Sequence, residues 1–242
     1  MSAARAPLPR PDPPGRRRSA AGAPVPDKRR LILDAAVRVF ARQGFHACRV
    51  SDIADEAGVA YGLVYHYFAS KDEVLNTLFL ERWNVMLEHI REVDAKPLPV
   101  REKLAAIAAF IIDSYRHDPD LMKVIIVEVT RAANSFGQTH LAEIRTAYEL
   151  IGGIVAKAQA DGDFKDEIEA RFAAMAFYGT IEQLLTGWIF GLLPQGAEEF
   201  ERAKWLVVET VCGGLEHGGE GARRSREGPA GAHQHARGGA AK

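Results

Sequence analysis

Hydrophobic residues recur with helical spacing along most of the chain. In the first such segment they occupy Ile32, Ala35, Ala36, Val39 and Phe40. This is the i, i+3, i+4, i+7, i+8 pattern of a helix with one apolar face. Asp27 precedes the segment as an N-cap, and Gly44 follows it as a stop signal. The pattern predicts a first helix between these two residues.

Similar apolar stripes predict helices further along the chain. They cover residues 71–94, 104–115, 121–131, 141–158, 172–190 and 200–211. Pro97 and Pro99 end the first of these, and Pro119 ends the second, because proline cannot continue a helix. The alternating pattern of a half-buried strand is absent from the sequence. We therefore expect an all-α fold.

Two shorter helices are predicted within residues 44–71, which read GFHACRVSDIADEAGVAYGLVYHYFASK. The first has Val50, Ile53, Ala54 and Ala57 on one face and ends at Gly58, where glycine reaches a left-handed conformation at little cost. The second covers residues 60–67. It buries Leu63 and Val64, and it exposes Tyr61, Gly62, Tyr65 and His66. This arrangement is typical of a helix-turn-helix that reads duplex DNA.

The exposed residues of the second helix are the candidate DNA contacts, since this helix enters the major groove in a helix-turn-helix. Tyr61 and Gly62 are placed to meet base edges. Tyr65, Tyr67 and Lys71 suit phosphate contacts, which fix register without reading sequence. The remaining candidates are Arg49, Ser51, Ala60 and His66.

The segments AAVRVFARQGF (35–45) and VSDIADEAGVAYGLVYHYFASKDEVL (50–75) resemble the TetR/AcrR family of transcriptional regulators. The family often has Ser or Thr as the cap of both short helices, where this chain has Cys48 with Arg49, and Ala60. A lost cap costs roughly 1 kcal/mol. The resemblance implies an N-terminal three-helix helix-turn-helix DNA-binding domain and a C-terminal helical ligand-binding and dimerisation domain.

The domain organisation follows from composition. Residues 1–25 are rich in Pro, Ala and Arg and are expected to be a disordered basic arm. Residues 26–71 form the DNA-binding domain, residues 72–213 the effector-binding and dimerisation domain, and residues 214–242 a disordered tail. The net charge of the whole chain is −1, but before residue 31 eight cations face two carboxylates, a net of +6. Such an arm attracts phosphate, although a solvated tail has the same composition.

Residues 178–191 are apolar on more than one face, which predicts a helix that is buried or lies in an interface. Gly179 and Gly187 would let a second helix approach closely. Together with residues 200–211 this helix could form a four-helix interface in a homodimer, which a palindromic operator requires. The alternative is a monomer whose core buries these faces.

The resemblance also implies a cavity for a small lipophilic effector. The candidate lining, with His140 as a further polar anchor, is Phe110, Tyr115, Ile126, Arg131, Asn134, Tyr148, Phe177, Tyr178 and Trp188. Each of these could equally be an ordinary core residue. The segments 116–124, 130–134 and 176–190 resemble the FadR type of fatty-acid-degradation regulators, which leave DNA when they bind long-chain acyl-CoA. If the effector is an acyl-CoA, Arg131 or another cation would face its nucleotide. A different lipophilic molecule is the alternative effector.

Other functional classes lack their motifs. The sequence has no HExxH, P-loop, GxSxG or CxxC, and no Glu-x-x-His pairs for a di-iron site, so we predict no catalytic residue, metal or cofactor. The pair of His140 and Glu143 is expected at the surface. Cys48 and Cys212 lack metal-ligand spacing and are expected to be reduced thiols in a cytoplasmic protein. No apolar stretch approaches the length that spans a bilayer, so we expect no membrane-spanning helix. The alternative function is a helical ligand-binding or protein-docking module without sequence-specific DNA binding.

Overall fold

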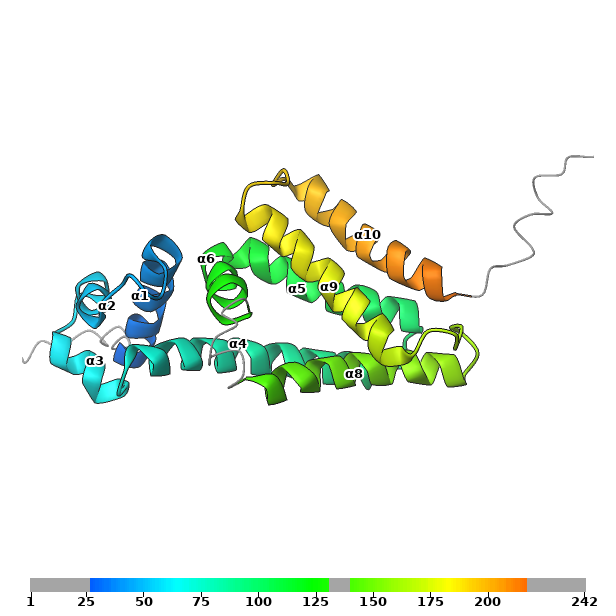
Figure 1. Cartoon of the computed structure of the whole chain (residues 1–242), viewed down its shortest axis with the longest axis horizontal. Helices are drawn as coiled ribbons and strands as arrows, with labels where there is room; N and C mark the ends of the chain where they lie inside the picture. Colours follow the sequence, from blue (N-terminus) through cyan, green and yellow to red (C-terminus); the bar gives the residue numbers. More distant parts are fainter. Residues whose placement is uncertain (1–26, 131–139, 217–242) are drawn as a thin grey trace, which may run out of the picture.

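The structure is a computed structural model that describes residues 27–130 and 140–216. Apart from an isolated β-bridge between Phe164 and Glu216, the described residues form helices joined by turns (Figure 1). The predicted all-α fold is confirmed. The basic arm, most of the C-terminal tail, and the candidate residues Arg131 and Asn134 lie outside the described residues.

The N-terminal domain consists of the three predicted helices α1 (Lys28–Gln43), α2 (Val50–Ala57) and α3 (Tyr61–Tyr67). Asp27 caps α1, because its carboxylate accepts a hydrogen bond from the Arg29 N–H at 3.0 Å, and α1 ends at Gly44 as predicted. The buried face of α1 packs against α2, and Phe40 lies in the core they share.

The C-terminal domain is built on the long helix α4 (Lys71–Asp94), which starts at the end of the N-terminal domain and runs along the molecule (Figure 1). Helix α8 (Leu141–Ala160) lies beside α4, and α9 (Ala170–Ile189) packs on α8. Helix α10 (Ala197–Leu215) packs against α9 and against α5 (Val100–His117). The predicted helix ends near 94 and before Pro119 are confirmed, whereas α10 extends four residues beyond the predicted end at 211.

One predicted helix has a different form in the structure. The segment expected as a helix over residues 121–131 begins at Pro119, where the Asp118 carboxylate caps α6 (Pro119–Lys123). It then continues as the π-helix η1 (Val124–Thr130). Val124, Ile125 and Ile126 are buried in succession, so this segment is enclosed on more than one side, and it contacts both α1 and α4. A helix surrounded in this way has no single apolar stripe from which its winding could be predicted.

Within residues 27–130 and 140–216, no helix is long and apolar enough to cross a membrane. Cys48 and Cys212 are free thiols, as predicted, and both are buried. Burial raises the pKa of the Cys212 thiol to about 11, so this sulfur is protonated at neutral pH.

Candidate DNA interface and effector sites

The turn between α2 and α3 depends on Gly58. This residue has φ 63° and ψ 38°, the left-handed conformation that the sequence predicted. The N-caps of the two helices are Arg49 and Ala60, and neither side chain makes a capping hydrogen bond. The Asp52 carboxylate instead accepts the Arg49 N–H at 2.7 Å and satisfies one donor at the start of α2.

The outer face of α3 carries a pair of tyrosines. Tyr61 and Tyr65 are 53% and 45% exposed, and their rings meet edge to face with centroids 5.2 Å apart. The Tyr61 hydroxyl donates a hydrogen bond to the Tyr65 hydroxyl at 3.2 Å. Gly62 and His66 are also exposed, as predicted, and nothing lies within 4 Å of where a Gly62 side chain would begin.

Tyr67 and Lys71 differ from the outward-facing phosphate contacts that the sequence suggested. Tyr67 is half-buried against the core. The Lys71 ammonium donates to the Phe45 carbonyl at 2.5 Å and to the Cys48 carbonyl at 2.8 Å, and it lies 4.4 Å from the centre of the Phe45 ring. Lys71 therefore ties the start of α4 to the loop between α1 and α2. A phosphate contact could use only its third donor.

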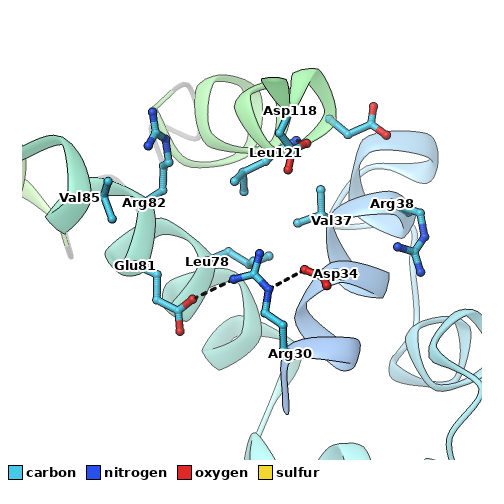
Figure 2. Close-up of a pocket in the computed structure, with 11 residues that line it drawn as sticks. Arg30, Asp34, Val37, Arg38, Leu78, Glu81, Arg82, Val85, Asp118 and Leu121 are labelled. Carbon is cyan, nitrogen blue, oxygen red and sulfur yellow. Dashed lines mark hydrogen bonds and ion pairs between the residues drawn. The ribbon is translucent and has the colours of Figure 1, made fainter. Parts of the chain in front are cut away.

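Ion pairs and a hydrogen bond connect the two domains. Glu81 on α4 pairs with Arg29 at 2.8 Å and with Arg30 at 3.7 Å, both on α1. The Lys123 ammonium on α6 donates to the Ala41 carbonyl at 2.7 Å. Figure 2 shows the cavity of about 440 Å³ between α1, α4 and α6, with Arg30 reaching both Asp34 and Glu81. The N-terminal domain is thus attached to α4 and α6 at once.

The aromatic residues expected around one effector cavity lie in several places. Tyr115 stacks on Trp188 with ring centroids 5.7 Å apart, and the Trp188 indole donates to the Pro194 carbonyl, which closes the turn between α9 and α10. Tyr178 meets Tyr148 at 5.6 Å, on the side where α9 packs against α8. Phe177 and Ile126 are fully buried core residues.

These side chains also border separate cavities. Phe110 lines one of about 540 Å³ between α4, α5 and α6. Tyr148 lines an apolar groove of about 620 Å³ between α8 and α9, and Trp188 lines a small cavity of about 190 Å³ at the α9–α10 turn. Burial raises the pKa of Tyr178 far above its usual value, so its hydroxyl remains a neutral polar group among aromatic rings.

His140 was expected at the surface with Glu143, and this expectation is wrong. The His140 side chain is 2% exposed and lies against Phe79, with ring centroids 4.2 Å apart. Its Nδ1 is 3.9 Å from the Glu143 carboxylate. Burial lowers the pKa of His140, which favours the neutral imidazole at pH 7. A position just before α8 is buried here because α8 packs along α4.

The cavity beside Phe110 is also lined by two polar residues that the sequence analysis did not select. Arg82 on α4 lies over the Phe110 ring at 5.0 Å, and His89, two turns later, stacks on the same ring with centroids 4.1 Å apart. His89 stands within the apolar stripe that predicted α4, and a histidine in such a stripe was the available signal. Arg82 gave none.

Comparison with known proteins identifies this architecture. Residues 32–78 match the family described as bacterial regulatory proteins, tetR family, and residues 79–192 match the YsiA-like protein, C-terminal region. The fatty acid metabolism regulator protein of Bacillus subtilis is 33% identical over 159 residues, which cover 65% of this chain and 81% of that protein. The chain belongs to the TetR family.

Other members of the TetR family extend the comparison. The transcriptional repressor KstR2 of Rhodococcus jostii is 29% identical over 147 residues, or 60% of this chain and 72% of that protein. The structure of the regulator FadR from Bacillus subtilis in complex with stearoyl-CoA has a TM-score of 0.69 and 27% identity, and the match covers 77% of this chain and 99% of that one. The TetR-family match confirms that α1 to α3 are a DNA-binding domain and that the chain is a transcriptional regulator.

Proposed function

We propose that this TetR-family regulator represses transcription by binding a palindromic operator as a homodimer, and that a long-chain acyl-CoA releases it. The observation that carries the proposal is the exposed face of α3 joined, through α4, to a C-terminal domain similar to that of a FadR structure holding stearoyl-CoA. Under this proposal the protein acts in the cytoplasm, where its DNA operator lies. The protein then regulates transcription and does not catalyse a reaction.

Exposed apolar side chains on α9 and α10 support the dimer. Phe172 on α9 is 57% exposed, and Trp205 on α10 is 61% exposed. Large exposed apolar side chains of this kind favour an interaction surface. Gly179 on the same side of α9 has open space around it, which would admit a second helix. Gly187, also expected in the interface, is instead covered by Leu193 of its own chain: a β-carbon there would lie 2.6 Å from Leu193 Cδ1.

The proposed release follows from linkage. A ligand that fits one arrangement of the C-terminal domain shifts the dimer toward that arrangement by its difference in affinity. Helix α4 continues from that domain into the DNA-binding domain, and Glu81 holds α1 to it, so a displaced α4 would carry the reading helices with it. Once α3 and its symmetry mate no longer match sites about 34 Å apart, operator affinity falls. A coupling of roughly 1–3 kcal/mol changes affinity about 5- to 150-fold.

Selection of bound duplexes from a random DNA pool, with and without stearoyl-CoA, tests the proposal. We expect a palindrome that is enriched by the purified protein and lost when stearoyl-CoA is added. A palindrome that persists with stearoyl-CoA would contradict the acyl-CoA effector and keep the dimeric reader. A pool without any enriched sequence would favour the alternative function, a helical docking module without sequence-specific DNA binding.

Tyr61 is proposed as a base-reading residue. Replacing Tyr61 by Ala should change the base preferred at one position of each half-site by about tenfold, with a smaller effect on total affinity, because base contacts carry specificity and phosphate contacts carry most of the affinity. Tyr61→Phe keeps the ring and removes the hydroxyl that bonds to Tyr65. This variant therefore separates the contribution of the ring to base preference from that of the hydroxyl. The measurement is binding to a set of operators with single base changes, and an unaltered preference in Tyr61→Ala would remove Tyr61 from base reading.

A further inference from the structure

Arg82 is a half-buried cation for which the described residues supply no counter-ion. No carboxylate of residues 27–130 or 140–216 forms an ion pair with it within 4.0 Å. It donates a hydrogen bond to the Ser114 hydroxyl, which in turn donates to the Phe110 carbonyl at 2.6 Å. This chain holds the guanidinium over the Phe110 ring and leaves most of its five N–H donors for other partners. Figure 2 shows Arg82 pointing away from the pair formed by Arg30 and Glu81.

The carboxylates near Arg82 have other partners. Asp113 accepts Lys204 at 2.8 Å and Arg116 at 3.2 Å. Asp118 accepts the Leu121 N–H at 2.9 Å as the cap of α6, and its charge acts on Arg82 without forming an ion pair within 4.0 Å. Burial lowers the pKa of Arg82, which shows that its positive charge is held at a cost in hydration. An arginine nevertheless stays charged at neutral pH.

His89 supplies a second unsatisfied group in the same cavity. Its Nε2 is buried and has no hydrogen-bond partner among the described residues. A buried polar atom of this kind costs free energy unless something pairs with it. Arg82 and His89 border the same cavity of about 540 Å³, and Phe110, Met122 and Ala106 give it an apolar wall. The cavity, which Asp113 and Asp118 also line, therefore combines a cation without an ion pair within 4.0 Å, an imidazole nitrogen without a hydrogen bond and apolar surface.

We propose that the cavity between α4, α5 and α6 binds the anionic group of an amphipathic effector, with Arg82 as its ion partner and His89 Nε2 as its hydrogen-bond partner. This inference rests on the proposed function and assigns the anchor of that effector to residues outside the aromatic set expected from the sequence. The effector class is an anion attached to a long apolar chain, either the phosphates of an acyl-CoA or the carboxylate of a free fatty acid.

The position of the cavity also connects it to the DNA-binding domain. Arg30, Arg82, Asp118 and Leu121 line both this cavity and the one between α1, α4 and α6. Glu81, the neighbour of Arg82 on α4, holds Arg29 and Arg30 of α1. An anion that shifts Arg82 would act one residue from Glu81, whose ion pairs fix α1 to α4. Binding of the effector could therefore change the position of the DNA-binding domain, which includes α3.

Calorimetric titration of the full-length protein with stearoyl-CoA, stearate and free CoA tests the site. Arg82→Gln should weaken binding of the acyl ligand by about tenfold or more, because a charge-assisted contact is lost. Arg82→Lys keeps the charge and should retain more of the affinity than Arg82→Gln. His89→Phe keeps the stacked ring and should weaken binding about fivefold. The matched control is Arg91→Gln, which removes an exposed arginine of α4 outside the cavity and should bind like wild type.

The outcomes separate the site from the effector. Arg82→Gln and His89→Phe proteins that bind the acyl ligand as tightly as wild type would overturn the site and leave the proposed function intact. A wild-type protein that binds neither stearoyl-CoA nor stearate would overturn both. Stronger binding of stearoyl-CoA than of stearate identifies phosphate as the anion, and the reverse identifies the carboxylate. Circular dichroism confirms that each variant is folded, and if Arg82→Gln is not, His89→Phe decides.

Discussion

Gly179→Trp should separate the protein into monomers and lower its affinity for a palindromic operator by about a hundredfold or more, since binding through two linked half-sites is worth roughly 10²–10⁴ in affinity. Gly179 lies on the side of α9 that carries exposed apolar residues, and nothing occupies the space beyond it. An indole there would prevent close approach by the helices of a second copy. Light scattering measures the mass, and gel-shift titration measures operator affinity.

Glu92→Trp is the matched control, because it introduces the same side chain at an exposed position of α4 that lines none of the cavities described above. This variant should remain a dimer with nearly wild-type operator affinity. If Gly179→Trp still forms a dimer, the interface lies on another face. Gly187→Trp would not be informative, because the new side chain would first collide with Leu193 and disturb the α9–α10 turn of its own chain.

The DNA-binding domain could be predicted from sequence almost completely because its signals are local. Asp27, Gly44 and Gly58 act through the backbone of their own turns, and each does so in the structure as predicted. The period of apolar residues decides which side of α3 faces the core, so the exposure of Tyr61 and Tyr65 followed directly. These conclusions require no knowledge of where distant segments meet.

The effector domain could be predicted only in outline, because helical phase shows that a face is apolar without showing which helix covers it. Tyr115 and Tyr178 both lie on buried faces, yet one meets Trp188 and the other meets Tyr148. The π-helical winding of η1 escaped prediction for a related reason, since its buried residues are consecutive. Arg82 resembled any polar residue of a long helix until the structure placed it over Phe110.

Lys71 is the residue whose interpretation changes most with the structure. Its position at the end of the helix-turn-helix suggested a phosphate contact, but its ammonium reaches the carbonyls of Phe45 and Cys48, 26 and 23 residues earlier in the chain. Both carbonyls belong to the loop that joins α1 to α2, and Cys48 and Phe45 are buried. Removing the ammonium would leave these acceptors unsatisfied, which typically costs about 1–3 kcal/mol.

We therefore expect Lys71→Met to lower the free energy of unfolding by about 1–3 kcal/mol. Methionine keeps an unbranched apolar side chain over the Phe45 ring and removes the charge. The salt dependence of DNA binding should keep its slope, since a phosphate contact is not what is lost. Lys28→Met removes a charge from an exposed position of the same domain and should leave stability unchanged. Urea unfolding gives the stability, and operator affinity at several salt concentrations gives the slope. Unchanged stability, together with a salt-dependence slope that is smaller by about one unit, would show that Lys71 contacts a DNA phosphate, because each neutralised phosphate contributes about one unit to that slope.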